Sequence, residues 1–167
     1  MLGIQASGTR GVILCVRTKR FTHRNQIDRV STKVVPLGMH ISPEIRRAID
    51  VYAMRKAEEY FRSAGYETKD VHKNRPFDLL CSRGSVRLFV EVKGTRSKEE
   101  QVILTSGEVK FAKKDPMHMV LYVQRLVRVT YGNGQPVVSG DKRLVKRQWT
   151  VDERSLEPLC FTYKLKR

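Results

Sequence analysis

One amphipathic helix constrains the fold of this chain more than any other segment. Ser42, Pro43 and Glu44 combine a capping hydroxyl, a proline suited to the first helical position and an acid at the positive end of the helix. Apolar residues then recur every three or four positions, and Gly65 is expected to end the helix. The apolar stripe predicts a helix of about 20 residues whose stripe packs on a sheet.

Short β-type segments accompany this helix, and they set the fold class. Strands are expected at 11–17, 66–71, 77–81, 86–93, 119–123 and 126–131, with a brief extended piece at 102–105 and a second helix at 106–114 capped by Ser106. This order indicates an α/β protein with a mixed central β-sheet flanked by helices. The 167 residues suggest one domain. We expect a basic N-terminal strand and arm at 1–40, an α/β core at 41–125 and a basic β-rich C-terminal extension at 126–167 that belongs to the same domain.

The charge balance points to a polyanionic partner. The chain carries 33 basic and 17 acidic residues, a net charge of +16, and the excess is concentrated in the two flanks. Phosphate contacts from Lys and Arg supply most of the sequence-independent affinity for nucleic acid, so DNA is the expected partner. A generically basic surface, or contacts within a larger assembly, would also explain the excess.

Several classes of protein are excluded by what the sequence lacks. No apolar run approaches the roughly 18–20 residues of a membrane span, and no signal peptide is recognisable. Three widely spaced cysteines and four histidines show no zinc-type spacing. We therefore expect a cytoplasmic protein with no membrane partner, associated with the nucleoid if its source is prokaryotic.

Two basic tracts are candidates for contacts with nucleic acid. They are Arg17, Lys19, Arg20 and Arg24 near the N-terminus, and Lys142, Arg143, Lys146 and Arg147 near the C-terminus. The first tract fits a nucleic-acid-contacting arm and equally a solvated connection. The second alternates bases with apolar residues, which fits a strand with a phosphate-facing side and also an edge strand kept soluble by its charge.

A hairpin in the middle of the chain is expected to gather three ionisable residues. A tight turn centred near 83–84 would pair Cys81 with Val86. Because side chains alternate between the two faces of a strand, Asp78, Glu91 and Lys93 would then share one face of the hairpin. Two carboxylates and an ammonium group on one sheet face are costly unless they pair or serve a purpose.

The purpose these groups suit is metal-assisted hydrolysis of a phosphodiester. Asp78 and Glu91 offer hard oxygen ligands for Mg²⁺ or Mn²⁺, and the backbone carbonyl of Val92 lies between them as a further ligand. A metal ion bound there would polarise the scissile phosphate and acidify a bound water.

Two further residues would complete such a site. Lys93 is suited to orient the attacking water and to offset charge on the phosphate. A helix carboxylate often completes sites of this kind, and of Glu58 and Glu59 we favour Glu59. The competing interpretation is that Asp78, Glu91 and Lys93 form only surface ion pairs on an exposed sheet face.

The residues of this segment resemble a known nuclease signature. Pro76-Phe77-Asp78 and Glu91-Val92-Lys93 resemble the motif of the PD-(D/E)xK nucleases. Over residues 45–125 the chain is also similar to the domain at the C-terminus of the NO VEIN protein. That similarity rests on Ala64-Gly65-Tyr66-Glu67, Phe77-Asp78-Leu79, Phe89-Val90-Glu91-Val92-Lys93-Gly94, Leu104-Thr105-Ser106-Gly107-Glu108 and Leu121-Tyr122-Val123. Relatives in that family often have Gly-Tyr-Asp where this chain has Pro-Phe-Asp.

The resemblance implies a restriction-endonuclease-like fold and sets expectations for function. It implies an endonuclease of restriction or repair type that hydrolyses DNA phosphodiester bonds with Mg²⁺ or Mn²⁺. Nucleases of this type often act as homodimers, and the NO VEIN C-terminal domain also occurs beside helicase-like and restriction-type ATPases, so both kinds of partner are implied. It further implies that Thr105, Ser106 or Lys110 lies near the substrate. A catalytically inactive nucleic-acid-binding or assembly module of the same fold is the alternative, and an RNA-binding protein ranks third.

Overall fold

The first helix forms as its caps and stripe predict. The computed structural model describes residues 41–97 and 101–157, and α1 runs over Pro43–Ser63. The Ser42 hydroxyl accepts a hydrogen bond of 3.3 Å from the backbone N–H of Ile45, and Pro43 occupies the first turn. After the helix the chain turns at Gly65, whose φ of +79° lies in the left-handed region. The predicted strand at 11–17 lies outside the described residues.

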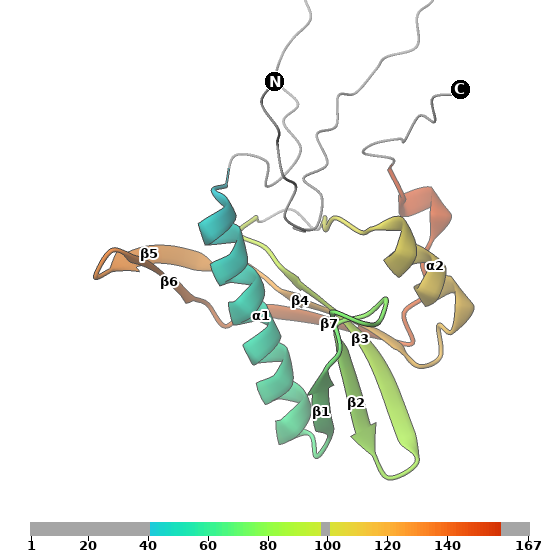
Figure 1. Ribbon diagram of the computed structural model, residues 1–167. Helices are drawn as coiled ribbons and strands as arrows, with labels where there is room; N and C mark the ends of the chain where they lie inside the picture. The colour runs from blue at the N-terminus through green and yellow to red at the C-terminus, as the bar shows by residue number, and fades with distance from the viewer. Residues whose placement is uncertain (1–40, 98–100, 158–167) are drawn as a thin grey trace, which may run out of the picture. The chain divides into compact units, whose positions relative to one another are not determined.

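Five strands form one mixed sheet in the order β1–β2–β3–β4–β7 (Figure 1). The strands are β1 (Glu67–Asp70), β2 (Leu79–Arg83), β3 (Val86–Gly94), β4 (Met119–Gln124) and β7 (Arg143–Arg147). The neighbours β3 and β4 run parallel, and the other neighbouring pairs are antiparallel. A parallel pair needs a crossover connection, and α2 (Ser106–Lys114) lies within it. The predicted α/β class with a mixed central sheet is confirmed.

The two helices pack on opposite faces of this sheet. On one face, Phe61 of α1 belongs to a buried cluster with Val90 and Val92 of β3. On the other face, Phe111 of α2 lies 5.6 Å, centroid to centroid, from the ring of Phe89. Because alternate residues of β3 point to opposite faces, the odd-numbered residues of this strand face the side of α2.

The register of the β2–β3 hairpin differs from the predicted one by two residues. Cys81 pairs with Leu88 rather than with Val86, and Val86 pairs with Arg83. The loop is therefore shorter than expected, and Gly84 enters it with a φ of +57°, which only glycine adopts at little cost. A slip of two residues leaves every side chain on its predicted face, whereas a slip of one would have reversed the faces.

Two local predictions near the hairpin are wrong: the start of the strand expected at 77–81 and the residue that caps α2. The strand expected at 77–81 begins only at Leu79, because the backbone N–H of Asp78 bonds to the carbonyl of Val90 outside the regular ladder. The piece expected to be extended at 102–105 belongs to no helix or strand, and Thr105 has extended backbone angles. Its last residue, Thr105, caps α2 in place of Ser106, which is the first residue of the helix.

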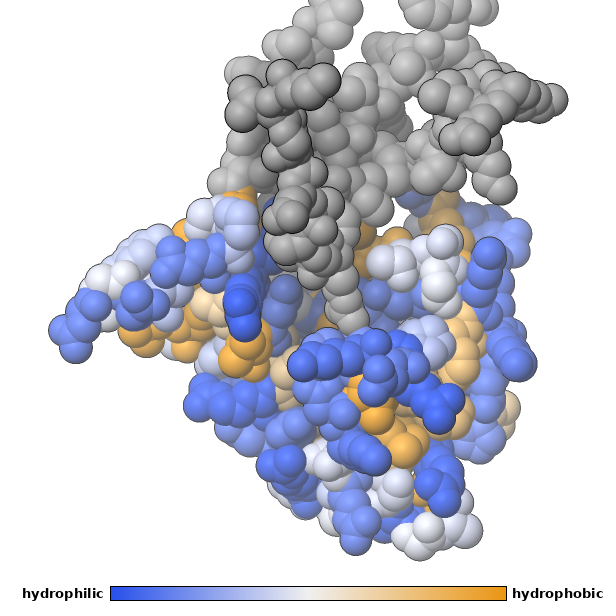
Figure 2. Space-filling model, in the orientation of Figure 1, coloured by the Kyte–Doolittle hydropathy of each residue, from blue (hydrophilic) through white to orange (hydrophobic). Residues whose placement is uncertain are grey.

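The C-terminal part is rich in strands, as predicted. β5 (Arg128–Gly132) and β6 (Gln135–Ser139) form a separate two-stranded sheet, and Asn133 and Gly134 between them both have positive φ, as a type I′ turn requires. Figure 2 shows apolar atoms along the projecting β5–β6 hairpin, where Tyr131 and Val137 are exposed. A short 3-10 helix, Glu153–Ser155, follows β7. Within the described residues, no helix has the length and apolar character to cross a membrane.

Candidate functional site

Glu91, Lys93 and Glu108 form a linked ionic group on the α2 face of the sheet. The ammonium nitrogen of Lys93 lies 2.6 Å from Glu91 Oε1 and 3.1 Å from Glu108 Oε2. The side chain of Glu91 is only 2% exposed, and those of Lys93 and Glu108 are 21% and 17% exposed. Two carboxylates thus share one ammonium group in a largely water-free setting, where unpaired charge is costly.

Asp78 reaches the same site from the chain that enters β2. Its Oδ2 accepts a hydrogen bond of 3.0 Å from the backbone N–H of Val92, which lies between Glu91 and Lys93 on β3. The backbone N–H of Asp78 also bonds to the Val90 carbonyl, at 2.9 Å. These two bonds hold the carboxylate of Asp78 against β3, the strand of Glu91 and Lys93, and its charge acts on Glu91.

A capping box fixes Glu108 in the first turn of α2. The Thr105 hydroxyl accepts from the backbone N–H of Glu108, and Glu108 Oε2 accepts from the backbone N–H of Thr105 at 2.8 Å. The same Oε2 accepts from Lys93, so one carboxylate oxygen both closes the start of the helix and binds the lysine. The position of α2 is therefore coupled to the position of Lys93.

The pKa values of Glu91, Lys93 and Glu108 are all shifted from their ordinary values. Burial, with the nearby charges of Asp78 and Glu108, raises the pKa of Glu91 to about 8, although Lys93 opposes the shift. Burial alone would lower the pKa of Lys93, but the two glutamates outweigh it and raise that pKa. Burial would likewise raise the pKa of Glu108, but Lys93 and the Thr105 N–H lower it. Near neutral pH, Lys93 therefore pairs with ionised Glu108 while Glu91 tends to hold a proton.

The carboxylate oxygens of Asp78 and Glu91 are donors of the kind that hard divalent cations bind. Glu91 Oε1 is buried and makes no hydrogen bond of normal geometry, although Lys93 lies beside it. Within the described residues, 41–97 and 101–157, there is no group of three or more His, Cys, Asp or Glu side chains that could hold a metal ion. Mg²⁺ keeps several waters and commonly binds through one or two carboxylates together with substrate phosphate, so Asp78 and Glu91 suffice for that mode.

Glu59 does not join this site, contrary to the expectation. Its carboxylate lies 2.7 Å from Lys56 Nζ and 3.8 Å from Arg55 Nε on the exposed side of α1, and its side chain is 49% exposed. The physical reason is the sheet itself, because α1 covers the face of Val90 while Glu91 points to the other face. The helix carboxylate beside Lys93 is Glu108 of α2.

Glu108 is absent from the site predicted from sequence, although a local signal for it exists. Thr105-Ser-Gly-Glu108 has the spacing of a capping box, which predicts that the acid lies in the first turn of a helix. That spacing does not predict which face of the sheet the helix covers. The contact with Lys93 follows only from the crossover between β3 and β4.

The predicted nucleic-acid-binding residues are divided among several places. Lys110 is exposed on α2, and Lys142 is exposed just before β7. On β7, Lys146 is level with Leu121, whereas Arg143 lies over the ring of Tyr60, at 5.0 Å, and Arg147 over that of Phe61. Among the described strands, β7 is the last at one edge of the sheet, the position that the interpretation of this tract as an edge strand predicts. Arg17, Lys19, Arg20 and Arg24 lie outside the described residues.

A comparison with known families matches the part of the chain that holds these residues. The family described as Protein NO VEIN, C-terminal, matches residues 49–136, a span from within α1 to the beginning of β6. The match includes Asp78, Glu91, Lys93 and Glu108. Neither the search of curated proteins nor that of solved structures gave a match to the chain. Because the matched residues make up more than half of the sequence, this chain belongs to the family of NO VEIN C-terminal domains.

Proposed function

We propose that this protein is a metal-dependent endonuclease that hydrolyses phosphodiester bonds of DNA with Mg²⁺ or Mn²⁺. The observation that carries the proposal is the buried carboxylate of Glu91, which lies 2.6 Å from Lys93 with Asp78 anchored on the same strand. Carboxylates whose pKa is strongly perturbed by burial and by a specific charged neighbour occur most often at functional sites. The resemblance of these residues to the PD-(D/E)xK motif and the net charge of +16 support the same chemistry.

In this proposal the two carboxylates bind the cation. Asp78 and Glu91 supply one oxygen each, and the Val92 carbonyl is the third protein ligand. The bound ion would polarise the scissile phosphate and lower the pKa of a coordinated water. Asp78 already accepts the Val92 N–H, which restricts the motion of its carboxylate before any ion arrives.

Lys93 is proposed to act on the substrate, with Glu108 as its positioning residue. With the charge of Glu91 committed to a cation, Lys93 keeps one ionised partner, Glu108, at 3.1 Å. Its remaining N–H groups then point to the substrate phosphate and to the attacking water. Glu108 belongs to the N-terminus of α2, so a shift of this helix would move Lys93 with it.

A catalytically inactive nucleic-acid-binding module of the same fold is the second candidate. It is favoured by the two ion pairs of Lys93, because Glu91 and Glu108 already occupy its ammonium group. The lack of a three-ligand metal cluster in the described parts of the chain also favours it. Cleavage by the wild-type protein decides between the two candidates.

The test is cleavage of supercoiled plasmid DNA by the full chain in Mg²⁺, in Mn²⁺ and in EDTA. We expect cleavage with either ion, none in EDTA, and a loss of at least about 100-fold in Asp78→Ala and Lys93→Ala. Lys69→Ala is the matched control, because Lys69 is exposed on β1 of the same sheet. Cleavage that persists in both site variants would overturn the assignment of the site. No cleavage by the wild type, with DNA binding retained, would favour the inactive module.

A further inference from the structure

A row of three aligned residues extends from Glu91 to the edge of the sheet. Glu91 of β3 is level with Leu121 of β4, and Leu121 is level with Lys146 of β7. Aligned residues of neighbouring strands point to the same face, so Lys146 shares the face of the candidate site. Strands lie about 4.8 Å apart, and the backbone of Lys146 is therefore about 10 Å from that of Glu91.

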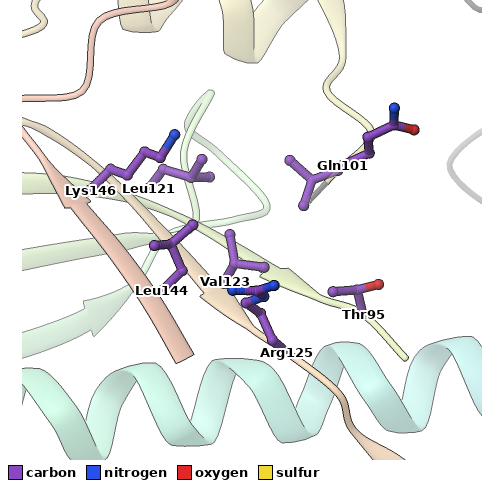
Figure 3. Close-up of a pocket in the computed structure, with 8 residues that line it drawn as sticks. Thr95, Gln101, Leu121, Val123, Arg125, Leu144 and Lys146 are labelled. Carbon is purple, nitrogen blue, oxygen red and sulfur yellow. The ribbon is translucent and has the colours of Figure 1, made fainter. Parts of the chain in front are cut away.

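A small cavity opens beside this row. Its volume is about 60 Å³, and Leu121, Val123 and Leu144 supply apolar walls that rise from β4 and β7 (Figure 3). The cavity has room for more than one water but is far smaller than the 300–1,000 Å³ or so of a typical small-molecule pocket. It therefore suits part of a larger ligand, such as one phosphate group and the edge of a sugar, rather than a whole nucleotide.

Among the described residues that line this cavity, the charged ones are Arg125 and Lys146, and both are basic. Lys146 is exposed, and no ion pair between residues of the described ranges includes it. An exposed ammonium group at the rim of such a cavity attracts anions.

The other bases of β7 differ from Lys146 in their surroundings. Arg143 and Arg147 alternate with Lys146 and lie on the α1 face, where their guanidinium groups cover the rings of Tyr60 and Phe61. These cation–π contacts give the two arginines a structural role, which is to pack against the aromatic side chains of α1. The sheet thus separates the bases of one tract into two groups.

We propose that Lys146 and this cavity form a phosphate-binding subsite for the DNA strand that occupies the Glu91–Lys93 site. The proposal rests on the proposed function, which supplies the DNA and the place where it is cut. The distance of about 10 Å between the backbones of Lys146 and Glu91 would place this phosphate within a few nucleotides of the cut. The strand would run across β3 and β4 towards the β7 edge, and Arg125 adds a second positive charge.

The test is DNA binding by the full chain at several salt concentrations in EDTA, where no cutting is expected. Fluorescence anisotropy with a short labelled duplex compares wild type, Lys146→Gln and Arg143→Gln, the last as the control from the opposite face of the same strand. We expect Lys146→Gln to weaken binding and to reduce the slope of log K against log salt by about 0.9, the loss of one phosphate contact. Arg143→Gln should leave the slope unchanged.

The possible outcomes separate this subsite from the proposed function. If wild type cuts DNA while Lys146→Gln binds with the wild-type slope, the subsite is wrong and the nuclease stands. Equal slope losses in Lys146→Gln and Arg143→Gln would also overturn it, because general charge loss would then suffice. If the wild-type protein never cuts DNA but Lys146→Gln alone reduces the salt slope, the phosphate-binding subsite is supported and the protein is a binding module rather than a nuclease. Wild type that does not bind DNA overturns the subsite.

Discussion

The Oε1 atom of Glu91 lies 2.6 Å from the ammonium nitrogen of Lys93, although the Glu91 side chain is only 2% exposed. Glu108 shares the same ammonium group at 3.1 Å, so the buried group has more carboxylates than cations. Protonation of Glu91 relieves this imbalance, and a bound divalent ion would relieve it equally well. A proton and a divalent ion would therefore compete for Glu91.

Without metal, the stability of the protein should fall as the pH rises from about 5 to about 8. The pKa of Glu91 is about 8 in the folded protein, against an ordinary 4.5, so between these values the folded state binds more protons than the unfolded state. Stability contributed by protonated Glu91 is complete below the ordinary pKa and is lost as the pH rises through 8. Urea unfolding in EDTA at several pH values measures this slope.

Glu91→Gln is the control for that slope, because glutamine has nearly the shape of protonated glutamate and does not titrate. The variant should show a shallower decline between pH 5 and 8 than wild type. The lowered pKa of Glu108 acts below this range and the raised pKa of Lys93 above it, so neither masks the difference. Parallel pH profiles for wild type and Glu91→Gln would show that Glu91 is ionised in the folded protein.

The convergence of Asp78, Glu91 and Lys93 was predictable, whereas the helix acid was not. The two-residue period of a strand places side chains on faces, and that assignment survived an error of two residues in the hairpin register. The helical period likewise predicts which stripe of α1 is apolar, but it does not say which face of the sheet receives the stripe. The position of Glu59 on α1 therefore agreed with the helical period, but α1 packs on the opposite face of the sheet from Glu91.

Glu108→Gln should reduce DNA cleavage by about tenfold or more, while Glu59→Gln should leave it unchanged. Glu108 donates no proton in this account, but its charge holds Lys93, and hydrogen bonds to charged groups contribute about 1.5–3 kcal/mol. Single-turnover cleavage at saturating DNA measures the difference. The pH dependence should also change, because Lys93 loses one of the carboxylates that raise its pKa. Loss of cleavage in Glu59→Gln with full activity in Glu108→Gln would reverse the assignment.

Thr105→Ala should lower the free energy of unfolding by about 1 kcal/mol, the usual cost of removing a helix cap. The Thr105 hydroxyl accepts the N–H of Glu108, so its loss loosens the turn that positions Glu108. Ser106→Ala is the matched control, since Ser106 is the first residue of α2 and is not its cap. Denaturant titrations of both variants measure the change, and equal losses would show that Thr105 is not the cap.

Gly94→Ala should be destabilising by about 1–3 kcal/mol, the usual cost of overpacking a core. A Cβ atom at Gly94 would lie 2.6 Å from Cγ2 of Ile49 and 3.1 Å from the Ile49 carbonyl oxygen. This glycine follows Lys93 directly and lets α1 approach the end of β3. Ile49→Ala should partly rescue Gly94→Ala in a double-mutant cycle, because it removes the side-chain clash and leaves the backbone one. Additive losses would place the strain elsewhere.

The most direct test of the central claim is to measure the binding of Mn²⁺ to the full chain at pH 7. Titration calorimetry in two buffers of different ionisation heat gives both the affinity and the number of protons released. That claim is that Asp78 and Glu91 form a divalent-cation site whose occupancy competes with the proton on Glu91. We predict saturable binding to wild type with release of about one proton per ion, because Glu91 has a pKa of about 8 and must ionise to bind. Glu91→Gln should abolish the proton release, and Asp78→Asn should weaken binding. The account would be contradicted if the wild-type protein bound no Mn²⁺, or if both variants bound Mn²⁺ as tightly as the wild type does.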